Sequence, residues 1–311
     1  MRETFTRCLE AEARHNPNLV LITGDLGFGV LFPFMKEFPG QFLNAGISEQ
    51  AMMSMAAGMA MEGKTVVVYS IGNFPTLRCM EQIRNCCAYH AVNVKIVCVG
   101  AGFVYGTLGM THHATEDMSA LRVLPGVTVY APADAVETEA VMARFLTEPG
   151  VAYLRIGRGG EPLFHEKGSL EGYQTGAAVP YCDGTDAYIL TAGGILSSAV
   201  GAQKLLAERG ISVGVASFPT VKPIDAAYLE GLSNRMPVLF TLEEHTVVGG
   251  FGGAVCEVVS GLAGQRARVV RIGMNDLYSS IVGTQAYLES YYGLDAQSVA
   301  DRVQAVLEHR A

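Results

Sequence analysis

The sequence lacks the features that mark several classes of protein. It has no run of eighteen apolar residues, although a membrane-spanning helix needs about twenty. It has no cluster of Lys and Arg, and its formal net charge is −8, so nucleic acids and anionic membranes are poor candidates as partners. The first residues form a polar helical pattern that differs from a signal peptide. These absences predict a cytoplasmic protein that binds neither nucleic acid nor membrane.

The cysteines are few and scattered. Seven occur among 311 residues, and none forms a CxxC pair or a spacing typical of metal ligands. An odd-numbered set with mostly apolar neighbours is typical of reduced thiols in a protein core. We therefore expect neither a disulfide framework nor a metal site in this chain.

The apolar residues that are present indicate a fold. They make up half of the sequence, which is enough for two ordinary domain cores. Apolar runs of strand length alternate with helical patterns, as in a parallel α/β sheet that is covered on both faces. In the first half, the expected strands are 19–23, 65–71, 94–100, 127–130 and 151–156, and the expected helices are 4–14, 48–61, 76–91, 115–122 and 134–147.

The alternation stops at 157–180, where glycines and charged residues replace the apolar pattern. It then resumes to the end of the chain. The expected strands of this second part are 187–191, 212–217, 238–242 and 267–272, and the expected helices are 195–209, 225–232, 250–262 and 296–309. We expect two α/β domains, 1–165 and 181–311, each with a mostly parallel sheet flanked by helices, joined by a linker at 166–180.

One carboxylate stands out in this pattern. Glu49 lies at the start of a helix that is apolar on every side and rich in methionine. A helix that is apolar all round is buried, and a buried glutamate almost always has a hydrogen-bonding partner. That partner is either a structural group or a ligand.

Other candidate functional residues follow strand ends, where α/β proteins bind ligands. His112 and His113 lie in a glycine-rich loop and suit proton transfer near neutral pH. Phe74 follows the strand at 65–71, and Arg155 with Arg158 suits a phosphate or a carboxylate. Each also has a structural explanation, as a loop or capping histidine, a core aromatic residue or a member of a salt bridge.

Taken in order, these features resemble the C-terminal half of the transketolase family. That half consists of the pyrimidine-binding domain and the C-terminal domain of thiamine diphosphate enzymes. The matching motifs cover essentially the whole chain and are 24–26, 46–50, Phe74 with Arg78 and Arg84, Thr111-His112, 120–129, 131–134, 155–159, 219–225, 243–245 and 249–253.

The resemblance implies thiamine diphosphate as the cofactor. In the family, the matching glutamate hydrogen-bonds N1′ of the aminopyrimidine, so Glu49 would activate the cofactor and take it as a partner in place of a protein side chain. Phe74 would stack on the pyrimidine ring, and Asp25 and Leu26 would line the cofactor site.

The resemblance also implies residues that bind the substrate. His112 would face the substrate's oxygens as a proton donor or acceptor, although the sequence leaves open whether His112 or His113 faces the site. Arg158, together with Arg2, would hold a substrate phosphate. Leu108 departs from the family, because members that act on sugar phosphates commonly carry Asp four residues before the histidine.

A second departure concerns the diphosphate. Full-length transketolases begin with a domain whose Gly-Asp-Gly and Asn bind Mg²⁺ and the diphosphate. This chain has only Cys182-Asp183-Gly184, with no Asn at the required distance. We therefore expect a partner subunit that supplies this domain, in an α2β2 assembly with self-association through this β subunit.

The function implied is that of the β subunit of a split transketolase, which moves a two-carbon ketol unit from a ketose to an aldehyde. A synthase of the deoxyxylulose-phosphate type, which decarboxylates pyruvate, is a close alternative. The β subunit of a 2-oxo acid dehydrogenase is another. A non-catalytic homologue is a third, and the joint presence of Glu49, Phe74 and His112 argues against it.

Overall fold

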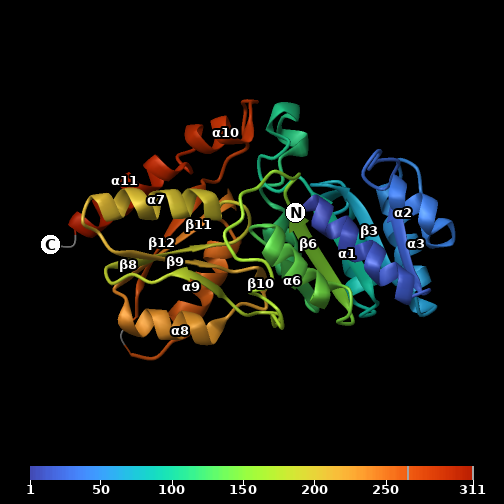
Figure 1. Ribbon diagram of the computed structural model, residues 1–311, viewed down its shortest axis with the longest axis horizontal. Coiled ribbons are helices and arrows are strands. Elements are labelled where there is room, and N and C mark those ends of the chain that lie inside the picture. The colour runs from blue at the N-terminus through green and yellow to red at the C-terminus, as the bar shows by residue number, and fades with distance from the viewer. Residues whose placement is uncertain (265, 310–311) are drawn as a thin grey trace.

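The chain folds around two β-sheets, each flanked by helices (Figure 1). The computed structural model describes residues 1–264 and 266–309. In this part of the chain, one sheet has seven strands in the order β10-β5-β6-β4-β3-β1-β2, and the other has five in the order β12-β11-β8-β9-β7. Most neighbouring strands are parallel, so the predicted α/β fold is confirmed.

The first half of the chain supplies most of the seven-stranded sheet and the helices beside it. Its strands are β1 (Leu19–Thr23), β2 (Phe42–Asn44), β3 (Thr65–Ile71), β4 (Val94–Val99), β5 (Val127–Tyr130) and β6 (Val151–Ile156). Its helices are α1 (Arg2–His15), α2 (Phe32–Glu37), α3 (Glu49–Met61), α4 (Met80–Gln82), α5 (Asp117–Arg122) and α6 (Ala135–Phe145). Every residue of β1, β4 and β6 is buried, as expected of strands covered on both faces.

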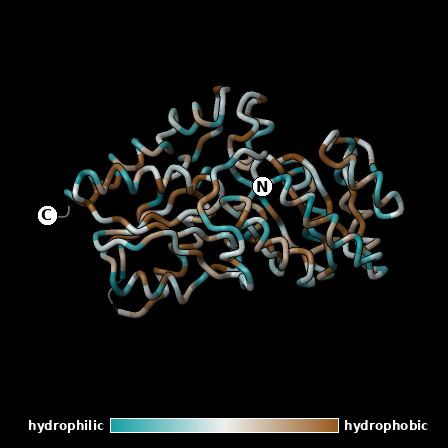
Figure 2. Tube along the Cα trace, in the orientation of Figure 1, coloured by the Kyte–Doolittle hydropathy of each residue, from teal (hydrophilic) through white to brown (hydrophobic). Residues whose placement is uncertain are grey.

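The second half supplies the five-stranded sheet. The strands of that sheet are β7 (Val179–Cys182), β8 (Ala187–Thr191), β9 (Val213–Ser217), β11 (Val238–Thr246) and β12 (Arg268–Met274), and the second half also supplies β10 (Thr220–Lys222) to the seven-stranded sheet. The helices of the second half are α7 (Leu196–Glu208), α8 (Ala226–Arg235), α9 (Phe251–Gly261), α10 (Gln285–Tyr291) and α11 (Ala296–Glu308). Hydrophobic residues gather along the strands, and the outer helices interleave them with hydrophilic ones (Figure 2). None of the helices at 1–264 and 266–309 is long and apolar enough to cross a membrane.

Several elements differ from the sequence-based prediction. The expected helix at 76–91 is broken into a 3-10 turn (Leu77–Cys79), α4 and a π-helical segment (Ile83–Ala88). The short strands β2, β7 and β10 and the helices α2 and α10 were not predicted. β7 begins at Val179, inside the segment expected to be linker. β10 leaves the second half and pairs antiparallel with β5, with Thr220 opposite Tyr130.

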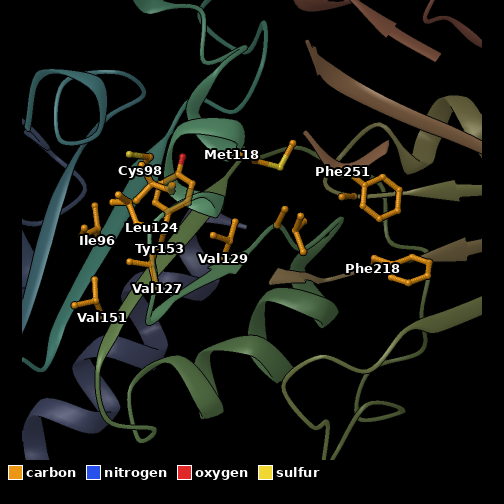
Figure 3. Close-up of a cluster of buried hydrophobic side chains, with 14 of the residues drawn as sticks. Ile96, Cys98, Met118, Leu124, Val127, Val129, Val151, Tyr153, Phe218 and Phe251 are labelled. Carbon is orange, nitrogen blue, oxygen red and sulfur yellow. The ribbon is translucent and has the colours of Figure 1, made fainter. Parts of the chain in front are cut away.

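The two halves share a hydrophobic core. One cluster of buried side chains runs from the face of the first sheet beneath α3 and α5 to α9 and the β9–β10 turn (Figure 3). Val129 and Tyr153 on the first sheet belong to the same cluster as Phe218 and Phe251 from the second half. Burial of apolar surface stabilises a fold roughly in proportion to the buried area. This shared core therefore stabilises the contact between the two halves.

A buried ionic cluster joins the halves as well. Arg155 of β6 donates from Nε to Asp117 of α5 at 2.9 Å, and Tyr153 donates a hydrogen bond to the same carboxylate. The other end of the guanidinium, Nη2, donates to the carbonyl oxygens of Ala114 (2.7 Å) and Glu244 (2.9 Å), which belong to different halves. Both charged side chains are at most 1% exposed, so each depends on the other.

Substitution of Asp117 tests this dependence. Asp117→Ala leaves the Arg155 guanidinium buried without its counter-charge, and we expect a loss of about 3–5 kcal/mol in the free energy of unfolding. Urea denaturation measures it. The control Asp301→Ala removes an exposed pair with Arg209 and should leave stability nearly unchanged. Equal effects of the two substitutions would contradict the structural role of the cluster.

A second buried cluster fixes the segment that follows β6. Asp134 caps α6 through the N–H groups of Val136 and Glu137, and its other oxygen accepts from Phe164 N–H at 2.8 Å. Glu137 bonds His165 Nε2 at 3.0 Å. Burial lowers the pKa of His165, but the hydrogen bond that its ring donates to Glu137 and the negative charges of Glu137 and Asp134 together outweigh burial, so the pKa is raised above its ordinary value.

This raised pKa makes stability depend on pH. The folded protein binds the proton of His165 more tightly than the unfolded chain does, so the contribution is full below the unfolded pKa of about 6.5. It is lost as pH rises through the folded pKa. We expect His165→Gln to lower the free energy of unfolding at pH 5.5 and to lower it less at pH 9. A difference from wild type that is the same at both pH values in urea denaturation would refute this linkage.

Candidate functional site

The carboxyl ends of β1, β2, β3 and β4 form one edge of the seven-stranded sheet, because these neighbouring strands are parallel. Four loops start there, at 24–31, 45–48, 72–79 and 100–114. Open parallel sheets bind their ligands at this edge. All the residues that we expect at the cofactor lie in these loops or at the first residue of α3.

Glu49 is the first residue of α3 and is only 5% exposed. Gly46 has φ +71°, which turns the chain from β2 into the helix. Gly24, after β1, lies close by: a Cβ at Gly24 would lie 3.3 Å from the Gly46 oxygen and 3.8 Å from Glu49 Cγ. The start of the helix favours a carboxylate, because the unpaired N–H groups there carry partial positive charge.

Arg78 is a partner of Glu49 that the sequence analysis missed. Its Nη1 donates to Glu49 Oε2 at 2.8 Å, and its guanidinium lies over the ring of Phe74, 4.7 Å from the centroid. The expectation that a cofactor takes the place of a protein partner is therefore wrong for Oε2. No hydrogen bond to Oε1 is found from the residues at 1–264 and 266–309. Arg78 belongs to a motif that carried the family resemblance, but the motif did not indicate that Arg78 contacts Glu49.

The two adjacent histidines of the loop at 100–114 have different surroundings. His112 packs edge-on against Phe74, with ring centroids 5.2 Å apart, and its Nδ1 is 3.0 Å from Thr111 Oγ1. His113 is buried, bonds the Gly106 oxygen at 3.2 Å, and has its pKa lowered by burial. The structure thus brings His112 beside Phe74, and it turns His113 into the interior.

Asp25 and Leu26 follow β1 at the same edge. Asp25 has φ +57° and exchanges two hydrogen bonds with Asn44, each of 3.0 Å. Asn44 also accepts from Gly46 N–H at 2.9 Å, so it ties the loop of Asp25 to the loop that leads into α3. Leu26 is half-buried, and its carbonyl oxygen accepts from Thr23 Oγ1.

Arg2 and Arg158 come from α1 and from the segment after β6, and both lie near Tyr105. The Arg158 guanidinium is 5.9 Å from the Tyr105 ring centroid. Burial raises the pKa of Tyr105, and the charges of Arg158 and Arg2 oppose this rise. Tyr105 lies on the loop that carries His112, so the two arginines lie near that loop. Sequence reasoning missed Tyr105, since a lone tyrosine in a loop carries no pattern.

The edge also exposes apolar side chains. Each of the four loops presents at least one, namely Phe28, Ile47, Leu77, and Leu108 with Met110. Exposed apolar groups that gather at one place mark an interaction surface. Among the residues described, no group of three or more His, Cys, Asp and Glu is placed to hold a metal ion.

Comparison with known proteins gives the same family for both halves. The transketolase pyrimidine binding domain matches residues 1–160, and the transketolase C-terminal domain matches residues 176–299. The chain is 36% identical over 304 residues to a protein of Methanocaldococcus jannaschii described as a transketolase C-terminal section, covering 97% of this chain and 95% of that protein. It is 34% identical over 300 residues to a subunit of the apulose-4-phosphate transketolase of Phocaeicola vulgatus, covering 96% and 94%.

A solved structure agrees with these relatives. It is described as a split gene transketolase in the form of an inactive beta4 tetramer. The two structures superpose with a TM-score of 0.87 and 33% sequence identity, covering 99% of this chain and 97% of that one.

The pair formed by Glu49 and Arg78 can be measured by a double-mutant cycle. We compare Glu49→Ala, Arg78→Ala and the double variant by urea denaturation. Because the Glu49 side chain is buried and that of Arg78 is 47% exposed, we expect a coupling energy of about 1 kcal/mol. Additive effects, within about 0.3 kcal/mol, would show that the two groups do not interact.

Proposed function

Because the chain belongs to the transketolase family, we propose that it is the pyrimidine-binding β subunit of a split, thiamine diphosphate-dependent transketolase. It transfers a two-carbon ketol unit from a ketose donor to an aldehyde acceptor. The observation that carries this proposal is the buried carboxylate of Glu49 at the sheet edge where Phe74 and His112 meet. Relatives of nearly the same length support it, since one of them is a subunit of a transketolase.

The residues at the edge fit the pyrimidine half of the cofactor. Glu49 offers Oε1 as an acceptor, Phe74 offers an aromatic face, and Leu26 offers an apolar side chain. Gly24 leaves room beside the carboxylate that a Cβ would reduce. When bound, this cofactor supplies the nucleophile and the electron sink for breaking and forming bonds next to a carbonyl carbon.

The side chains of this chain then have defined tasks. Glu49 would share a proton between its Oε1 and the ring nitrogen of the aminopyrimidine, and its burial would strengthen that hydrogen bond, because water does not compete for it. Arg78 holds Oε2 in place through its hydrogen bond, and Phe74 would offer its ring for the pyrimidine to stack on. His112 gives a proton to a substrate oxygen or takes one from it. Arg158 and Arg2 hold a substrate phosphate from the side of Tyr105.

A partner subunit supplies the diphosphate and Mg²⁺ ligands in this proposal. The chain has no Gly-Asp-Gly followed by Asn, and the apolar side chains of the four loops offer a surface for a second polypeptide. The solved split gene transketolase that consists of β chains is described as inactive. We propose an α2β2 enzyme that also self-associates through its β subunits.

Leu108 bears on the substrate. It is 54% exposed on the loop of His112, and an apolar side chain there makes no hydrogen bond to a substrate hydroxyl. We propose a sugar or sugar-like acceptor that places less demand on that contact than ordinary sugar phosphates do.

Glu49→Gln tests the proposal. The chain is combined with the partner subunit, thiamine diphosphate and Mg²⁺, and turnover is followed with a panel of ketose donors and, separately, with pyruvate. Because the amide cannot exchange a proton with the cofactor, we expect turnover to fall by at least about a hundredfold. Circular dichroism and subunit assembly should stay the same. Turnover with pyruvate but not with ketoses would instead favour a decarboxylating synthase.

The matched control is Glu62→Gln, an exposed carboxylate just after the last turn of the same helix. It should keep wild-type turnover. Near-normal turnover of Glu49→Gln would contradict the role of Glu49 in activating the cofactor. Turnover without the partner subunit would contradict the split-enzyme proposal.

A further inference from the structure

The loop that carries His112 is held from the second half of the chain. At its start, Phe103 N–H donates to Glu244 Oε1 at 2.8 Å. The Phe103 ring stacks on Tyr292, with centroids 5.5 Å apart and an angle of 14° between the planes. Glu244 lies on β11, and Tyr292 directly follows α10. The loop and α10 lie side by side (Figure 1).

The Glu244 carboxyl fits closely against the loop backbone. Gly102 has φ +54°, and a Cβ there would collide with the Glu244 carboxyl group. Gln285 Nε2 lies 3.1 Å from both carboxyl oxygens, so α10 fixes the orientation of the group. Burial, and after it the nearby Glu289 carboxyl, raises the pKa of Glu244 above its ordinary value. Glutamine keeps the shape of the group and its acceptor oxygen, and is therefore a close mimic of it.

The same half also contacts the middle of the loop. Gly283 N–H donates to the Gly106 oxygen at 3.3 Å, and a Cβ at Gly106 would lie 2.6 Å from Leu288 Cδ1. The Gly106 oxygen is also the partner of His113 Nε2. His112 N–H donates to the Gly109 oxygen at 2.9 Å, so the position of His112 follows from that of the turn before it.

We propose that Glu244 and Tyr292 are positioning residues for His112, and that the C-terminal domain sets the geometry of the loop that faces the substrate. The inference deepens the proposed function, because it takes from it that His112 touches substrate. The link to the loop is direct: Glu244 and Tyr292 both contact Phe103, nine residues before His112 on the same loop. Other residues, Arg155 and Asp117, hold the two halves together.

Hydrogen exchange of the isolated full chain tests the anchoring. Peptides that cover 104–114 should exchange about tenfold faster in Glu244→Ala and in Tyr292→Leu than in wild type. Glu244→Gln keeps an acceptor for Phe103 N–H, and Gln285 can turn its amide to meet it, so exchange should return to the wild-type rate. The control Glu257→Ala removes another contact between the halves, the pair with Arg122, and should leave these peptides unchanged. Tyr292→Leu serves alone if Glu244→Ala does not fold.

Turnover with the partner subunit tests the catalytic consequence. A displaced His112 should lower kcat by about ten- to a hundredfold with little change in KM, and Glu244→Gln should recover most of it. Unchanged exchange at 104–114 in both Glu244→Ala and Tyr292→Leu overturns the inference, whatever the turnover. Faster exchange with unchanged kcat also overturns it, and the fault then lies in the role given to His112 and not in the anchoring.

Discussion

The guanidinium of Arg155 is the contact on which the arrangement of the chain depends. It is buried at the end of β6, pairs with Asp117, and donates to carbonyl oxygens on both sides of the boundary between the halves. One of those oxygens belongs to Ala114, the last residue of the loop that carries His112, and the other to Glu244, which holds the start of that loop. A buried charge tolerates few geometries, because each lost hydrogen bond leaves it unpaired. The pair therefore fixes where the loop begins and ends.

The candidate site is complete on one side only. The sheet edge brings together an acceptor, an aromatic face and a histidine from separate loops. The same loops carry exposed apolar side chains, whose contact with water costs free energy unless another surface covers them. The proposed division of labour follows from this asymmetry: the pyrimidine belongs to this chain, and the diphosphate to another.

Sequence reasoning found the long elements and the unusual carboxylate, since both leave a pattern. A short apolar run between polar residues predicts β1 directly, and Glu49 is conspicuous at the start of an apolar helix. Three-residue strands such as β2 and β10 contain too few residues to show alternation, so their pairing is decided by tertiary contacts. The break of the predicted helix into shorter segments at 77–88 could not be predicted, because these residues include no proline or glycine.

The contacts within the site were also beyond the sequence. The choice between His112 and His113 depends on how one loop packs, and adjacent positions give no preference. The pair of Arg78 with Glu49 joins residues 29 positions apart, and the approach of Arg2 and Arg158 to Tyr105 joins three distant segments. Such distances are set by the fold and not by spacing along the chain.

The strand β10 has a consequence for how the chain acquires its structure. Its residues, Thr220–Lys222, form the edge strand beside β5 in a sheet whose other strands all lie before residue 157 in the sequence. During synthesis, the first sheet therefore exposes the outer edge of β5 until about sixty further residues have left the ribosome, and an open edge invites pairing with other chains. Closure of that edge requires the second half to fold beside the first. The two halves are thus successive in the sequence and interdependent in folding, and a chain shortened before Thr220 would leave its first sheet without its last strand.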